Sequence, residues 1–134
     1  MKLSVFLVIN SIIAAVFGLG FVLMPGQVLS FYGVAGDAPL EYTGQLFGAA
    51  LVSFAVLTWC VRNVPDSEAR RAILLALLVG DAVGVVVSLI AQLGGVVSAA
   101  GWSTVAIYLL LAIGLAYFRF AAGSESSKEH GPVM

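Results

Sequence analysis

The sequence predicts an all-α protein: an integral membrane, antiparallel four-helix bundle that forms a single domain over residues 1–122. Of the 134 residues, 61% are hydrophobic and only 10% are charged. An average soluble domain carries about 45–50% apolar and about 25% charged residues, and a small domain needs charge to cover its large surface. The composition therefore excludes a water-soluble globular enzyme, and its high hydrophobicity excludes a disordered chain.

Four apolar stretches are each long enough to cross a bilayer, whose core of about 30 Å takes roughly 20 helical residues. Because backbone groups in lipid must bond within their own segment, we expect each stretch to be a helix. The expected helices cover residues 3–24, 41–61, 72–93 and 102–120.

The first helix is expected to end where Pro25 and Gly26 interrupt it. Its apolar run exceeds the 7–15 residues of a signal-peptide core and has no small-residue cleavage pattern. A retained helix is therefore favoured over the alternative, a cleaved signal peptide. The next segment, residues 25–40, is either an amphipathic stretch in the headgroup region or an irregular loop.

The remaining helices also have boundary signals. The second is expected to end at Arg62, and Asp66 or Ser67 is expected to cap the start of the third. The third ends at a pair of glycines that begins with Gly94, and the fourth follows Gly101.

The positions of the basic residues predict the orientation of the helices. Positive residues concentrate in the cytoplasmic loops of membrane proteins. All six lie on one side of a four-span topology, and the opposite loops have none: they are Lys2, Arg62, Arg70, Arg71, Arg119 and Lys128. We therefore expect a multi-pass protein of the inner (plasma) membrane with both termini in the cytoplasm. The polar segment 123–134 is expected to be a disordered cytoplasmic tail.

Asp81 is the one acidic residue near the middle of a predicted span. An aspartate there costs roughly 2.5–3.5 kcal/mol on insertion scales and normally faces the bundle interior, where it has a partner. Gly84, Ser88 and Gln92 follow at spacings that place them on the same helical face. Matching the depths of antiparallel helices gives the candidate partners, which are Asn10, Ser11, Ser53 and Tyr108.

This interior polar cluster has two interpretations. As packing contacts, small residues let helices approach and polar side chains bond across the interface at about 0.6–2 kcal/mol each. Burial then favours the protonated, neutral form of Asp81. As a functional site, the intramembrane acid marks a pathway for protons or a substrate. The sequence leaves both interpretations open.

Two further groups of residues need an interpretation. Glu41 and Gln45, at the start of the second helix, are either a hydrated helix end or an outer mouth of the interior site. Two G-x-x-x-G pairs predict close helix packing within or between chains. The packing candidates are Gly44, Gly48, Gly80 and Gly84, of which the first two could equally form a homodimer face.

No catalytic, metal or cofactor site is predicted. The single cysteine, Cys60, and the single histidine, His130, are far apart in the sequence, and no nucleotide-binding or metal-binding motif is present. A net charge of −1 provides no basic field for nucleic acid.

The layout of four spans over residues 3–120 resembles small uncharacterised bacterial membrane proteins, including those grouped as DoxX-like. The resemblance implies a membrane location. Small multidrug-resistance transporters also have four short spans, with an essential glutamate in the first. Here the first helix contains Asn10 and the acid is Asp81 in the third, so no residue role is transferred.

The first hypothesis for function is a structural or accessory subunit that contacts the lipid bilayer and associates with itself or with other membrane proteins. The alternative is a proton-coupled transporter or channel for a small molecule, with Asp81 as the titrating group. The second alternative is a protein that binds a lipid or a quinone.

Overall fold

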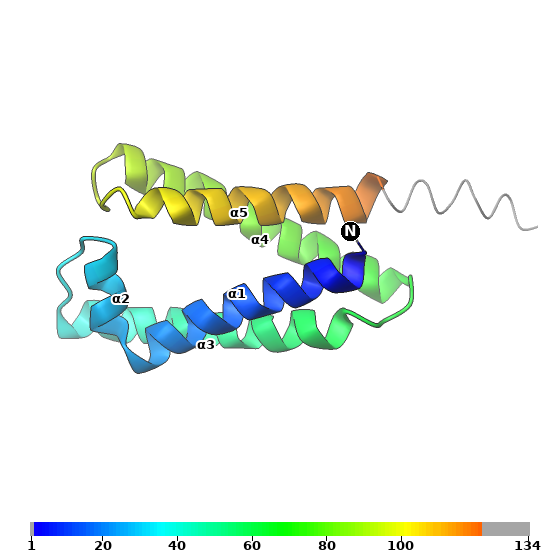
Figure 1. Cartoon of the computed structure of the whole chain (residues 1–134), viewed down its shortest axis with the longest axis horizontal. Coiled ribbons are helices and arrows are strands. Elements are labelled where there is room, and N and C mark those ends of the chain that lie inside the picture. Colours follow the sequence, from blue (N-terminus) through cyan, green and yellow to red (C-terminus); the bar gives the residue numbers. More distant parts are fainter. Residues whose placement is uncertain (1, 122–134) are drawn as a thin grey trace, which may run out of the picture.

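The computed structural model describes residues 2–121, which form helices joined by short loops (Figure 1). In chain order the helices are α1 (Leu3–Leu23), α2 (Pro25–Phe31), α3 (Ala38–Val61), α4 (Glu68–Leu93) and α5 (Gly101–Ala116), and α5 continues into the π-helical turn η1 (Tyr117–Ala121). No strand occurs within residues 2–121. The predicted tail, residues 123–134, lies outside the described residues.

Four of these helices are long and apolar enough to cross a membrane, judged by length and composition. They are α1, α3, α4 and the continuous segment formed by α5 and η1. The all-α prediction is confirmed, and the four predicted stretches correspond to these four helices.

The starts of α3 and α4 lie earlier than hydropathy alone predicts, because polar caps extend both helices. The Asp37 side chain accepts a hydrogen bond from the Leu40 backbone N–H at 2.9 Å, so α3 begins at Ala38 rather than at residue 41. The Ser67 hydroxyl accepts one from the Arg70 N–H at 3.2 Å, so α4 begins at residue 68 rather than 72. Ser67, and not Asp66, is therefore the cap.

The sequence allowed either an amphipathic stretch or an irregular loop after α1. In the structure the first seven residues of this segment are helical. Pro25 occupies the first turn of α2, where its missing N–H has no partner to lose. An extended loop then leads to α3.

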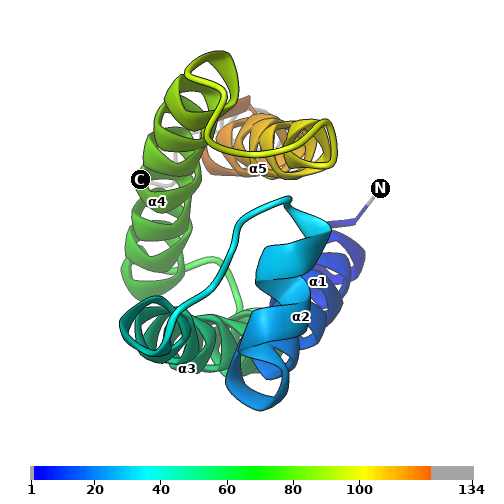
Figure 2. The same cartoon turned by 90° about the vertical axis from the view of Figure 1, so that its left-hand side faces the viewer.

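The long helices run antiparallel to their neighbours in sequence and form two pairs, α1 with α3 and α4 with α5 (Figures 1 and 2). The α1–α3 pair packs closely at two glycines. A Cβ atom added to Gly48 would lie 2.7 Å from the Gly18 carbonyl oxygen, which is too close for any larger residue. Small residues at this crossing therefore set the distance between the two helices.

The two pairs join at the end of the molecule where α1 begins. Leu7, Leu74 and Leu115 are almost completely buried there, in a core that also includes Val61. Because these residues come from α1, α4, α5 and α3 respectively, this core connects all four long helices.

The opposite end has a second, polar connection. The Ser98 backbone N–H donates a hydrogen bond to the Tyr32 carbonyl at 2.7 Å. The Thr104 hydroxyl donates one to the Tyr32 hydroxyl at 2.6 Å. The segment after α2 is thereby tied to the start of α5. The two helix pairs are connected at both ends, with a space between them.

The basic residues are distributed unequally between the two ends of the molecule. The described basic residues all lie at the end with the leucine core, and they are Lys2, Arg62, Arg70, Arg71 and Arg119. Arg119 Nε donates a hydrogen bond to the Arg71 carbonyl at 3.0 Å, which joins the last turn of the described chain to the start of α4. The opposite loops, residues 24–37 and 94–100, have no basic residue.

Candidate functional site

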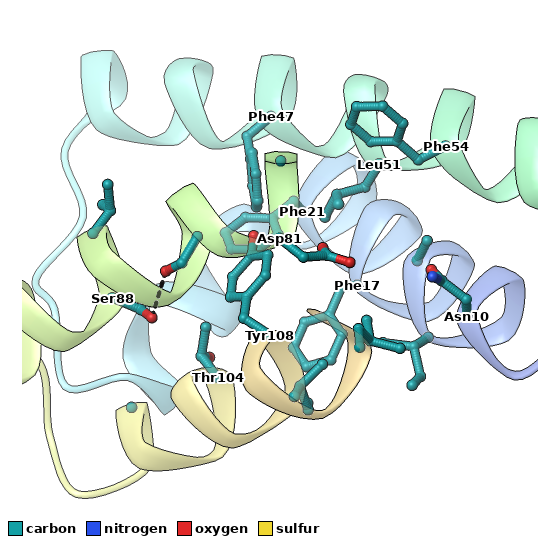
Figure 3. A pocket seen from close by; sticks show the side chains of 18 of the residues that line it. Asn10, Phe17, Phe21, Phe47, Leu51, Phe54, Asp81, Ser88, Thr104 and Tyr108 are labelled. Carbon is teal, nitrogen blue, oxygen red and sulfur yellow. Dashed lines mark hydrogen bonds between the residues drawn. The ribbon is translucent and has the colours of Figure 1, made fainter. Parts of the chain in front are cut away.

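A cavity of about 410 Å³ lies between the α1–α3 pair and the α4–α5 pair (Figure 3). Its volume is within the range of about 300–1,000 Å³ that is typical of small-molecule sites. Most of its lining is apolar. The polar side chains that line it are those of Asn10, Tyr32, Asp81, Ser88, Thr104 and Tyr108.

Asp81 lies halfway along α4, and its carboxyl group points into this cavity (Figure 3). The ion pairs of the described residues involve Asp66, and none includes Asp81. The basic residues of 2–121 all lie at or near the helix ends that meet at the leucine core. The carboxyl group of Asp81 therefore faces the cavity without a counter-ion from the described residues.

Asn10 contributes a second polar group from the opposite helix pair. It is only 7% exposed, yet it lines the cavity from α1. No hydrogen bond joins its side-chain amide to another described residue. Its amide therefore faces the cavity and is available to a bound molecule.

Tyr108 of α5 lies against α4 because Gly84 leaves room for its ring. A Cβ atom at Gly84 would lie 2.5 Å from the ring carbons Cδ1 and Cε1. Ser88, one turn further along, also lines the cavity, but its hydroxyl donates to the Gly84 carbonyl of its own helix at 2.6 Å. Asp81 and Tyr108 are therefore the polar groups on this side that point into the cavity (Figure 3).

The cavity opens sideways between α3 and α4. Its exposed lining residues all belong to these two helices: Phe47 is 43% exposed, Phe54 46% and Val87 61%, and Gly80 is also exposed. The lining residues contributed by α1 and α5 are buried or half-buried. The opening lies along the length of the helices rather than at either end.

Gly80 is at this opening, and no described residue packs closely against it, so its predicted role in helix packing stays a prediction for contacts between chains. A Cβ atom added to Gly80 would meet no other atom within 4 Å. Gly84 packs against Tyr108, as described above. On α3, Gly48 contacts Gly18, and a Cβ atom at Gly44 would lie 3.3 Å from the Phe21 ring. The face formed by Gly44 and Gly48 is thus covered by α1 of the same chain.

Three residues of the predicted polar cluster lie outside the cavity. Ser53 is exposed on α3, because the face of that helix toward α1 is set by Gly48. Ser11 is buried, but its hydroxyl donates to the Ala55 carbonyl of α3 at 2.7 Å, which makes it a packing contact. Gln92 donates to the Ser98 carbonyl at 3.2 Å in the loop before α5.

The predicted outer mouth is also absent from the cavity lining. Gln45 Nε2 donates to the Val22 carbonyl at 3.2 Å and so joins α3 to the end of α1. The Glu41 carboxyl group lies against Gly26 of α2, where an added Cβ atom would be 2.9 Å from it. Both residues connect helices at the end of the molecule where α3 begins, and neither lines the cavity.

Aromatic side chains form much of the cavity wall, and the sequence interpretation missed them. Phe17 and Phe21 follow Asn10 by seven and eleven residues, so all three share one face of α1. Phe47 and Phe54 have the same seven-residue spacing on α3. These spacings were visible in the sequence as aromatic stripes at helical period.

The chemistry of the site is that of a binding pocket with hydrogen-bond acceptors in an apolar wall. Within residues 2–121, no group of three His, Cys, Asp or Glu side chains is placed to hold a metal ion. Cys60 is exposed and does not line the cavity. The cavity can enclose an apolar molecule and orient its polar end toward Asp81 or Asn10.

These features define a class: an all-helical protein with four helices apolar enough to span a membrane and an interior cavity that opens sideways. A family model described as "Domain of unknown function (DUF8292)" matches residues 1–122, so the chain belongs to that family. No curated protein and no solved structure was found to match it.

Proposed function

We propose that this chain is a multi-pass membrane protein that takes a lipophilic molecule from the bilayer into its interior cavity. The membrane location is supported by the outward face of the long helices. Large apolar side chains are exposed along all four of them, for example Val16 at 64%, Ile90 at 66% and Leu110 at 66%. Apolar exposure on this scale is unfavourable in water and favourable in lipid.

The orientation follows from the distribution of charge. The described basic residues gather at the end of the molecule with the leucine core, and the opposite loops have none. By the positive-inside tendency, the end with the core faces the cytoplasm, together with both chain termini.

The observation that carries the binding function is the sideways opening between α3 and α4. In a bilayer, Phe47, Phe54 and Val87 would border a passage that leads to the hydrocarbon core. The leucine core lies at one end of the cavity, and the hydrogen bonds of Tyr32 join the two helix pairs at the other end. A molecule dissolved in lipid would therefore reach the cavity through the sideways opening.

Proton-coupled transport is the second candidate, and the position of the Asp81 carboxyl group in the cavity favours it. It requires a passage through the leucine core or past Tyr32. Proton or substrate flux in proteoliposomes that is lost in Asp81→Asn would favour transport over binding alone.

The binding function can be tested with labelled 1-dodecanol and the full chain in phosphatidylcholine nanodiscs, after subtraction of uptake by empty nanodiscs. We expect saturable binding of about one molecule per chain. Gly80→Phe places a ring at the opening, where an added Cβ meets no other atom within 4 Å. It should weaken binding by about tenfold or more, a loss of about 1.4 kcal/mol.

Val83→Phe is the matched control. Val83 lies on the same helix, is 56% exposed and does not line the cavity. It should bind dodecanol like the natural chain. Absence of saturable binding in the natural chain, or equal binding by Gly80→Phe, would contradict the proposal.

A further inference from the structure

We propose that the molecule held in the cavity is an amphiphile with a protonated amine, whose ammonium group bonds to Asp81 while its apolar tail leaves through the opening between α3 and α4. This inference rests on the proposed function and specifies the class of ligand. It is carried by three features of the cavity: a carboxyl group without a counter-ion among the described residues, a wall of aromatic rings, and an amide that faces the cavity and bonds to no described residue.

The first feature is the charge of the site. Among residues 2–121, the Asp81 carboxyl group is the only acidic side chain that lines the cavity, and no basic side chain lines it. A carboxylate in an apolar environment is stable only when it is paired and hydrogen-bonded. An ammonium group from the ligand supplies both the charge and the donors, and its hydrogen bonds to a carboxylate are of the strong, charge-assisted type.

The second feature is the aromatic wall around this carboxyl group. Rings from three helices line the cavity, among them Phe17, Phe54 and Tyr108 (Figure 3). Phe21 and Phe47 meet edge to face, with their ring centroids 5.3 Å apart, and so fix part of the wall between α1 and α3. Ring faces attract cations, and the attraction is stronger where water is excluded. Aliphatic side chains would give an equally apolar wall without this preference.

The third feature is Asn10. This residue is 7% exposed and lines the cavity, and its side chain bonds to no described residue. A primary ammonium has three N–H donors, and a carboxylate at Asp81 leaves some of them unused. The amide oxygen of Asn10 can accept one. Asn10 and Asp81 come from different helix pairs. An ammonium group that bonds to both residues would therefore link the two pairs.

The inference can be tested by comparing dodecylamine with 1-dodecanol in the phosphatidylcholine nanodiscs described above. The two compounds share one chain and differ in charge, because an alkylamine is protonated at neutral pH as a lysine side chain is. We expect the natural chain to bind dodecylamine about ten to a hundred times more tightly, since hydrogen bonds to charged groups contribute about 1.5–3 kcal/mol. Asp81→Asn should abolish this preference, because it removes the carboxylate that pairs with the ammonium group.

Two variants serve as controls. Asp81→Glu retains a carboxylate at the same position of α4 and should retain the preference. Glu41→Gln removes one carboxylate that does not line the cavity, and it should bind both compounds like the natural chain.

The outcomes separate the two proposals. Equal affinity of the natural chain for the amine and the alcohol, with binding of both still blocked by Gly80→Phe, would overturn the inference and leave the proposed function intact. An amine preference that survives in Asp81→Asn would also overturn it. If neither compound binds saturably, both proposals are contradicted.

Discussion

Gly80 and Gly84 offer a sharp test of the geometry around Asp81, because the same substitution should have opposite effects at the two positions. Both glycines lie in the interior of α4, one turn apart. Replacing either by alanine gains about 0.8–1.0 kcal/mol of helix propensity. At Gly80 a Cβ atom meets nothing within 4 Å, so we expect Gly80→Ala to be stabilising by up to this amount.

At Gly84 the same Cβ atom would lie 2.5 Å from the Tyr108 ring and 2.9 Å from its Cγ atom. Because the contact reaches the base of the side chain, the whole ring must move. Overpacking of this kind costs about 1–3 kcal/mol. The helix-propensity gain is the same at both positions, so it cancels, and Gly84→Ala should be about 1–3 kcal/mol less stable than Gly80→Ala.

The free energy of unfolding can be measured by titrating mixed lipid–detergent micelles with dodecyl sulfate and following helix content by circular dichroism. Tyr108→Leu provides the control, since it removes the ring that the new methyl group would meet. In that background Gly84→Ala and Gly80→Ala should have similar effects. Equal stability of the two alanine variants in the presence of Tyr108 would refute the packing described for this side of the cavity.

Three further predictions concern contacts at the ends and between the helices. Ser11→Ala should lower the free energy of unfolding by about 1 kcal/mol, because it removes the 2.7 Å hydrogen bond to α3, whereas Ser53→Ala should leave it unchanged. Tyr32→Phe removes the acceptor of the Thr104 hydroxyl and should speed amide hydrogen exchange in residues 98–104; unchanged exchange would contradict a role for this bond in joining the two helix pairs. Cysteine introduced by Ser98→Cys in a Cys60→Ala chain should react with an impermeant maleimide in intact cells, and Cys60 of the natural chain should not; the reverse pattern would invert the proposed orientation.

Hydropathy was sufficient to predict the four long helices, because each apolar run is about as long as the helix it forms. It placed the starts of two helices late. The first turn of α4 contains charged residues, whereas residues 38–40 of α3 are apolar and include Pro39, so hydropathy does not separate them from the loop before them. The caps Asp37 and Ser67 mark these starts in the sequence by residue type. Hydropathy could not decide whether the short segment after Pro25 is helical, because seven residues give too little periodic signal.

The sequence predicted only some residues of the candidate site, and there is a physical reason why it missed the others. Matching depths along antiparallel helices gives the height of a residue but not its rotation about the helix axis. Asn10, Asp81 and Tyr108 have both the right height and the right rotation, and they line the cavity. Ser53 lies at the right height but faces away from the cavity, because the contact of Gly48 with Gly18 fixes the rotation of α3. Such a contact between two helices depends on packing that a single sequence does not display.

The division of the chain into two helix pairs has a consequence for its assembly. Residues 2–61 contain the α1–α3 pair with its glycine crossing, and residues 68–121 contain the α4–α5 pair. Each half is a helical hairpin with its own internal packing, and the short link at residues 62–67 is the only covalent connection between them. If the chain is the membrane protein proposed above, the two hairpins could insert into the bilayer one after the other and dock afterwards, and the cavity would then form when the two halves meet.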